Sequence, residues 1–235
     1  MSGHSKWSQI KRQKAVTDLK KGQTFSKYSK AIYVAVKEGG SNPEFNFKLR
    51  LLLEKAKREG MPSDSIDRAV KKGSGEDKGV QITSVLYEGL GPAGSAFLVE
   101  CATDNSNRTL QEIRQIFLKN NGRLAESGSV SWNFQQKGLI LATSNNPDEV
   151  TLQAIDAGAQ DVNSTEEGLE IHTKPADLMK VKDAISQKSQ IHEASISWIA
   201  LQPIEVSDSE KEKIEKLENA LENAEDTVEV YNNLI

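Results

Sequence analysis

Basic side chains are concentrated in the first third of this chain, and a positively charged segment of this kind attracts polyanions. Residues 1–80 hold 18 Lys and Arg against 9 Asp and Glu, a net charge of +9, whereas residues 81–235 hold the other 12 and 25, a net of −13. Ammonium and guanidinium groups that neutralise phosphates release condensed counterions, so nucleic acid is the partner that this pattern favours. A solvated helical surface is the alternative interpretation of such a charge run.

The candidate nucleic-acid-binding residues surround one aromatic and follow helical spacing. Trp7 lies inside a basic cluster and would either stack on a base or anchor a short helix to its neighbour, and we prefer anchoring. At about 100° per residue, Lys20, Lys27, Lys30 and Lys37 share one helix face, which predicts an outward row of ammonium groups. The full predicted set is Lys6, Trp7, Lys11, Arg12, Lys14, Lys20, Lys21, Lys27, Lys30, Lys37, Lys48, Lys55 and Arg58.

The polar run 103–109 is a candidate functional loop between a strand and a helix. Helix capping explains one of its Asp, Asn and Ser residues but not all of them, and Thr109 with Glu112 has the spacing of a capping box. Arg108 near a helix start opposes the helix dipole, so we expect an anionic partner, either within the protein or in a ligand. The candidate loop residues are Asp104, Asn105, Asn107 and Arg108.

Motifs for catalysis or for a cofactor are weak in this sequence. The glycines of 89–94 have the spacing of a dinucleotide fingerprint, but a strand follows them instead of a helix, which indicates a hairpin loop. Cys101 lies on an apolar strand face, where a buried inert thiol is expected. His4, His172 and His192 have no partners at metal-ligand spacing. The sequence therefore predicts no enzyme, no metal site and no cofactor.

The first third of the chain shows helical periodicity, and the remainder does not. Apolar residues at helical spacing, among them Phe45, Leu49, Leu52 and Ala56, form the stripes expected to face a small core. Ser63 and Asp64 are the expected cap of the last of these helices. The four expected helices span residues 5–15, 22–38, 44–59 and 63–72.

From residue 80 the pattern changes to strands with intervening helices. Residues 137–200 predict the order β-α-β-β-α-β, which is the ferredoxin-like pattern. The tail 207–235 begins with a Ser207–Glu210 capping box and ends in strand spacing, so we expect it to return to the middle region. In that region the expected elements are strands 80–88 and 95–103, helix 107–120 and strand region 123–133.

These elements predict an α+β fold of three domains: a basic helical bundle at the N-terminus and two small α/β domains, the last one ferredoxin-like and inserted. The expected boundaries are 1–79 for the helical domain with its linker, 80–133 joined by 204–235 for the middle domain, and 134–203 for the insertion. No apolar run approaches the ~18 residues of a membrane span, and no secretory signal is evident, so we expect a cytoplasmic protein without a membrane partner.

Several local motifs resemble those of the YebC family over essentially the whole length. The resemblance rests on Gly3-His-Ser-Lys-Trp7, Glu38-Gly-Gly40, Met61-Pro62, Gly73-x-Gly75-Glu76, Tyr87-Glu-Gly-x-Gly-Pro92, Thr103-Asp-Asn-x-Asn-Arg-Thr109, and Gly128-Ser-Val130 with Trp132. The sequence departs from the family pattern at residues 11–14 and 47–48. The resemblance implies the same three domains, no catalytic activity and no cofactor.

The resemblance implies two functions that the residue chemistry barely separates. Bacterial members are usually described as DNA-binding transcriptional regulators, whereas mitochondrial relatives are described as activators of cytochrome c oxidase translation. The partner is accordingly DNA, ribosomal RNA or both, with the ribosome as a further candidate. Because the basic rows are mostly Lys, they suit phosphate contact without base readout. The oligomeric state is not indicated.

Overall fold

The computed structural model describes residue 7 and residues 18–76 and 81–234. The described chain forms two compact units, which we treat separately: residues 18–134 with 200–234, and residues 135–199 with Trp7. The fold is mixed α+β with two antiparallel four-stranded sheets, which confirms the predicted fold class.

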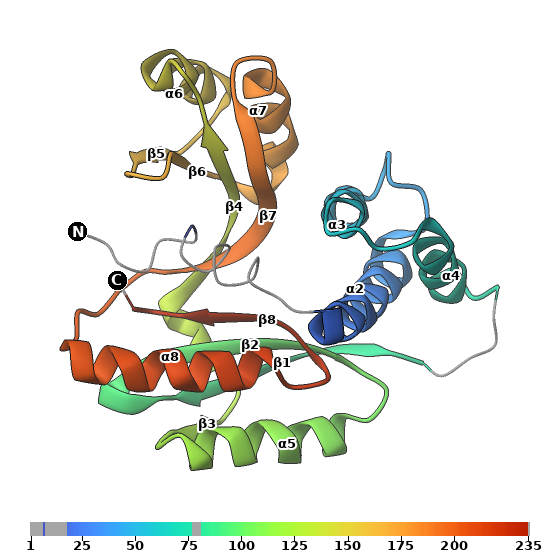
Figure 1. Cartoon of the computed structure of the whole chain (residues 1–235), viewed down its shortest axis with the longest axis vertical. Coiled ribbons are helices and arrows are strands. Elements are labelled where there is room, and N and C mark those ends of the chain that lie inside the picture. Colours follow the sequence, from blue (N-terminus) through green and yellow to red (C-terminus); the bar gives the residue numbers. More distant parts are fainter. Residues whose placement is uncertain (1–6, 8–17, 77–80, 235) are drawn as a thin grey trace. The chain divides into compact units, whose positions relative to one another are not determined.

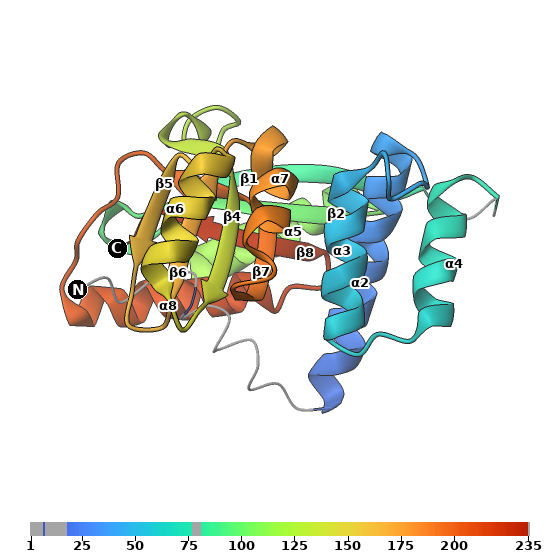
Figure 2. The ribbon, with the colours of Figure 1, turned by 90° about the horizontal axis from the view of Figure 1, so that it is seen from above.

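Three helices form the N-terminal part of the larger unit: α2 (Asp18–Gly39), α3 (Phe47–Arg58) and α4 (Ser63–Gly73). α2 packs against both α3 and α4 (Figure 2), and the buried side chains of Ile32, Leu49 and Ile66 belong to one core cluster. A Cβ at Gly73 would lie 2.7 Å from the Val36 Cβ, so glycine permits the close approach of α4 to α2.

Two expectations for these helices are wrong. The Phe45 side chain is 84% exposed instead of lying in the core, because Asn46 caps α3 and starts the helix after it. The Asn46 Oδ1 atom accepts the Leu49 N–H at 3.0 Å, and its Nδ2 atom donates to the carbonyls of Ala35 and Gly40 at 2.8 Å. The N-cap of α4 is Pro62 rather than Ser63 or Asp64, and it makes no side-chain cap bond.

The sheet of the larger unit has the order β3-β1-β2-β8 (Figure 1). Its strands are β1 (Thr83–Leu90), β2 (Ala96–Thr103), β3 (Arg123–Ala125) and β8 (Thr227–Asn232), and every neighbouring pair is antiparallel. Helices α5 (Ser106–Lys119) and α8 (Asp208–Glu222) cover one face. The tail thus contributes one helix and one edge strand to the sheet.

The core between this sheet and its helices is apolar. Phe97 of β2 and Phe117 of α5 meet edge to face with ring centroids 6.0 Å apart, and both belong to one cluster with Leu217 and Leu221 of α8. A Cβ at Gly89 would lie 2.3 Å from the Phe117 ring, so packing explains this glycine. The 89–94 segment joins β1 to β2, which confirms a hairpin loop instead of a nucleotide-binding turn.

The opposite face of the same sheet carries α2 at one end. Tyr33 and Val34 of α2 form a buried cluster with Ala102 of β2, and Val228 of β8 packs against it. Side chains alternate between the faces of a strand, so Cys101 points to the α5 and α8 side while Ala102 points to α2. The helical part is therefore packed onto the end of β2 and β8.

The smaller unit has the element order β-α-β-β-α-β and the strand order β5-β6-β4-β7, which confirms the ferredoxin-like prediction. Gly138 on β4 lies against Leu178 of α7, and the alternating residues Leu139 and Leu141 face the other way and pack with Trp7. The elements are β4 (Phe134–Thr143), α6 (Pro147–Ala157), β5 (Asp161–Ser164), β6 (Leu169–Thr173), α7 (Leu178–Ile185) and β7 (Gln190–Ala200).

Candidate nucleic-acid interface

A buried carboxylate, that of Asp226, organises the end of the sheet where α2 is packed. Asp226 follows α8 and directly precedes β8, and its side chain is completely buried. Its oxygens accept hydrogen bonds from two cations and two hydroxyls. These donors are Lys30 Nζ at 2.5 Å, Arg108 Nη2 at 2.9 Å, Thr103 Oγ1 at 3.0 Å and Thr109 Oγ1 at 2.6 Å.

Four donors keep Asp226 charged in spite of its burial. Burial by itself would raise the pKa of this carboxyl, but the hydrogen bonds from Lys30, Thr109, Arg108 and Thr103 hold it well below its usual range. The donors come from α2, from β2 and from the first turn of α5. Asp226 therefore ties the N-terminal helices to the sheet and to the polar run 103–109.

The polar run 103–109 is largely occupied by contacts within the chain. Asn105 caps α5 by accepting the Arg108 N–H at 3.1 Å, and Thr103 accepts the Asn105 N–H at 3.0 Å. Thr109 donates to Asp226, and Asn105 is the N-cap of α5, so the spacing of Thr109 and Glu112 does not mark a capping box.

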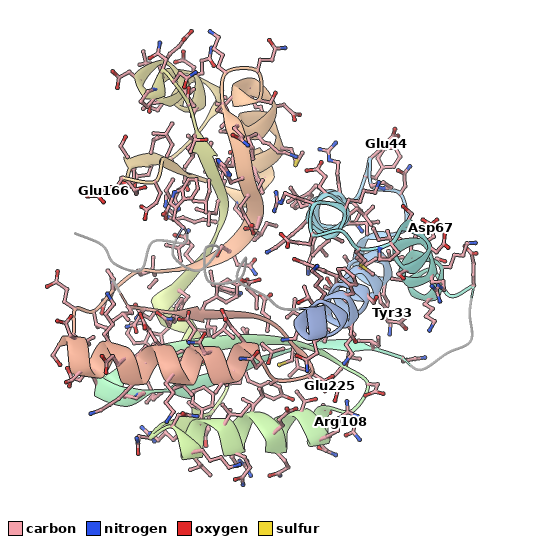
Figure 3. The ribbon with its side chains drawn as sticks, viewed as in Figure 1. Tyr33, Glu44, Asp67, Arg108, Glu166 and Glu225 are labelled. Carbon is pink, nitrogen blue, oxygen red and sulfur yellow. The ribbon has the colours of Figure 1, made fainter. Side chains whose placement is uncertain are left out.

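The candidate loop residues lie together but differ in what they offer a ligand. Arg108 finds its anionic partners in the protein, since its guanidinium contacts Asp104 and Asp226 at 2.9 Å each. Its side chain is still 47% exposed, and Asn105 and Asn107 are exposed beside it. Figure 3 shows Arg108 at the start of α5, near Glu225 of the turn that holds Asp226.

Three of the predicted nucleic-acid-binding lysines face an acidic segment of the same chain. Lys27 donates to the Glu222 carbonyl, Lys30 lies 3.8 Å from Glu225 in addition to its bond with Asp226, and Lys55 lies 3.9 Å from Glu229. Burial lowers the pKa of Lys27, an effect that the nearby Glu222 opposes. Two members of the expected outward row on α2, Lys27 and Lys30, therefore face inward. Together with Lys55 of α3 they form the inward set.

The exposed cations of α2, α3 and α4 form a second group, the outward set. Within it, Lys37 lies over the Tyr33 ring at 5.9 Å, and Lys48 pairs with Glu38 at 3.1 Å with both side chains about half exposed. In Figure 3 the labels of Tyr33 and Asp67 mark α2 and α4, two of the helices that carry this set. The outward set is Lys21, Lys37, Lys48, Lys57, Arg58, Arg68, Lys71 and Lys72.

Four members of the outward set are absent from the sequence prediction: Lys57, Arg68, Lys71 and Lys72. The signal was present, because Arg68, Lys71 and Lys72 have the i, i+3, i+4 spacing of one helix face. The predicted residues Lys6, Lys11, Arg12 and Lys14 lie outside the described residues, as does the side chain of Lys20.

Trp7 is an anchor, and its indole is not available for stacking on a base. The side chain is 6% exposed and packs on Leu139 and Leu141 of β4. Its ring meets the His192 ring edge to face at 5.2 Å. The sequence predicted that Trp7 anchors a short helix to its neighbour, and the structure shows that the residues it packs on belong to a strand more than 130 residues away.

Residues with catalytic potential are buried or scattered among the described residues. Burial raises the pKa of the Cys101 thiol to about 12, and its sulfur lies 3.7 Å from Thr227 Oγ1. Across residues 18–76 and 81–234, His, Cys, Asp and Glu form no group of three suited to a metal ion. None of the described helices is long and apolar enough to cross a membrane.

Comparison with known proteins places the chain in a family. A model described as the TACO1/YebC protein N-terminal domain matches residues 5–76, and one described as the TACO1/YebC second and third domain matches residues 82–234. These matches show that the chain belongs to the TACO1/YebC family.

Relatives and a solved structure match the whole chain. A probable transcriptional regulatory protein of Thermoanaerobacter pseudethanolicus is 45% identical, with 100% of this chain and 97% of the relative covered. A second probable transcriptional regulatory protein, from Persephonella marina, is 46% identical, with 99% of this chain and 95% of the relative covered. The crystal structure of a conserved hypothetical protein from Aquifex aeolicus is similar, with a TM-score of 0.87 and 41% identity. The match covers 98% of this chain and 97% of that one.

Proposed function

We propose that this protein regulates gene expression by binding nucleic acid, without catalysis, through the phosphate backbone. The observation that carries the proposal is the outward set, eight exposed Lys and Arg residues on α2, α3 and α4. Exposed cations held on rigid helices supply the sequence-independent part of nucleic-acid affinity. The names of the relatives, probable transcriptional regulatory proteins, agree with a role of this kind.

DNA is the first candidate ligand, and ribosomal RNA is the second. The composition of the outward set favours the second candidate, because six of its eight members are Lys. Lysine contacts phosphates as a point charge, whereas base readout in a DNA groove relies on Arg, Asn and Gln in bidentate geometry. A translation factor that binds ribosomal RNA would need only the phosphate contacts and no base readout.

The inward set refines where the contact would occur. Lys27 and Lys30 bond to the end of α8 and the turn after it, and Lys55 lies near Glu229 of β8, so the inward set contributes to holding the helices on the sheet. We therefore assign the phosphate contacts to α3, to α4 and to the exposed side of α2. Of the sequence-predicted residues, Lys21, Lys37, Lys48 and Arg58 belong to this surface.

Salt-dependent binding tests the proposal, and sedimentation separates its two candidate ligands. Affinity for duplex DNA and for structured RNA should fall steeply with salt, with a slope of about −0.9 per phosphate contact on DNA. Affinity for neither polymer at low salt would contradict the proposal.

In lysate at physiological salt, association with ribosomes that survives DNase and is lost with RNase would identify a translation factor. Recovery on DNA and absence from ribosomes would identify a transcriptional regulator. The quadruple variant Lys57→Gln, Arg68→Gln, Lys71→Gln, Lys72→Gln should lose either association, and wild-type behaviour of this variant would place the contact elsewhere.

A further inference from the structure

One exposed aromatic lies on a loop that a buried carboxylate fixes in place. Trp132 is 63% exposed, and it ends the segment 126–132 that follows β3. The sequence predicted a strand through residue 133, but the strand stops at Ala125. The backbone N–H groups of Gly128, Val130 and Ser131 point instead at Glu88 of β1, at 2.7, 2.6 and 2.8 Å from its carboxylate oxygens.

Glu88 keeps its charge at this position. Its residue is 3% exposed, and burial would raise the pKa of the carboxyl, but the N–H donors of Gly128, Ser131 and Val130 lower it below the usual value. A buried carboxylate with three backbone donors is a rigid clamp for a loop. Gly128 completes the turn with a φ of +86°, a conformation that favours glycine.

The indole of Trp132 is itself oriented by the loop. Its Nε1–H donates to the Ser129 carbonyl at 2.9 Å, which satisfies its only polar atom. On the following side, Asn133 is buried, and its Oδ1 atom accepts the Gln202 N–H at 2.9 Å while its carbonyl accepts the Leu201 N–H at 2.8 Å. The ring is thus exposed and held from both ends.

The surroundings of the ring suit a planar polar partner more than an apolar one. Residues 126–131 are Glu-Ser-Gly-Ser-Val-Ser, and the one apolar side chain among them, Val130, is buried. Leu201, whose N–H bonds to the Asn133 carbonyl, is also apolar and is 55% exposed. Two isolated side chains are far less than the several hundred Å² of apolar surface typical of a protein docking site. Arg123 is exposed on the strand that leads into the loop and adds a cation.

We propose that Trp132 is a stacking platform for an unpaired base of the bound nucleic acid. The inference rests on the proposed function and extends it, because it adds a base contact in the middle of the chain to the phosphate contacts of α3 and α4. Stacking on an indole tolerates every base, since each has a π face, so the contact selects single-stranded or looped segments over duplexes without reading sequence.

Oligonucleotide binding tests the inference with three variants. The probes are a labelled single-stranded RNA of mixed sequence and a duplex DNA of the same sequence. Trp132→Ala should weaken binding to the single strand about ten-fold, with no change for the duplex and no change in the salt slope. Trp132→Phe should retain most of the affinity and lose the quenching of tryptophan fluorescence that accompanies binding of the single strand.

Leu201→Ala is the matched control, because it removes exposed apolar surface from the residue that bonds to the Asn133 backbone, next to Trp132 in the chain, without removing a π face. It should bind like the wild type. Equal affinity of Trp132→Ala and wild type for the single strand would overturn the stacking role, and so would an equal loss in Leu201→Ala. The wild-type measurement separates the two proposals. If the wild type binds neither probe, the proposed function is contradicted. If it binds the single strand and Trp132→Ala binds with the same affinity, only this inference is contradicted.

Discussion

The inward and outward sets of cations come from the same helices yet have different surroundings. Lys30 is 17% exposed and bonded to a fully buried carboxylate, whereas Lys48 is 51% exposed and paired with an exposed glutamate. A buried ion pair contributes to how elements are joined, and an exposed cation is available to a solvent-borne polyanion. The comparison shows that charge density along a sequence does not say which cations face outward.

Removal of the carboxylate at the centre of the inward set should have the largest effect on folding. Asp226→Ala removes the acceptor that Lys30, Arg108, Thr103 and Thr109 share, and we expect a loss of about 3–5 kcal/mol in the free energy of unfolding. Urea denaturation measures it. Glu225→Gln, at a neighbouring side chain that is 72% exposed, should change stability by no more than about 0.5 kcal/mol. Similar losses in the two variants would contradict a central role for Asp226.

The buried carboxylates should also make stability depend on pH. The folded pKa values of Asp226 and Glu88 lie below their unfolded values, about 3.9 and about 4.3, so their contribution is complete above a pH of about 5 and is lost as the pH falls through the folded values. We expect the free energy of unfolding to decrease steadily below pH 5, as measured by urea denaturation across a pH series. In Asp226→Asn the free energy of unfolding should decrease less as the pH falls. An unchanged pH dependence would exclude Asp226 as one of its sources.

An exposed pair from the outward set should matter least for stability. Lys48→Ala breaks the contact with Glu38, in which both side chains are about half exposed, and should cost about 0.5 kcal/mol or less. Thermal or urea unfolding would show it. A loss as large as that of Asp226→Ala would remove the distinction between the two sets.

Local signals predicted most of the fold. The change from helical to strand periodicity near residue 80, the β-α-β-β-α-β order and the Ser207–Glu210 capping box are all encoded within a few neighbouring residues. The expectations that proved wrong depend on one side chain with distant partners. Asn46 moved the start of α3 by bonding to Ala35 and Gly40, and Glu88 prevented a strand after Ala125 by taking the N–H groups of a loop.

The candidate site was less predictable because its geometry joins segments far apart in the chain. Arg108 was expected to have an anionic partner, but Asp226 lies 118 residues away from it and 196 residues from Lys30. Helical spacing showed that Lys27, Lys30 and Lys37 are near one another on α2 but could not show that an acidic turn covers two of them. The exposure of Trp132 follows from the Glu88 clamp and had no sequence signal of its own.

The most direct test of phosphate binding by the outward set compares two double variants with the same change of charge. Lys71→Gln with Lys72→Gln removes two outward cations, and Lys27→Gln with Lys55→Gln removes two inward ones. The measurement is the affinity for duplex DNA as a function of salt. We predict that the outward variant lowers the salt slope by about 1.8, because each phosphate contact contributes about 0.9, while the inward variant loses stability and retains the wild-type slope. An unchanged slope in the outward variant, or an equal decrease in both, would contradict the account.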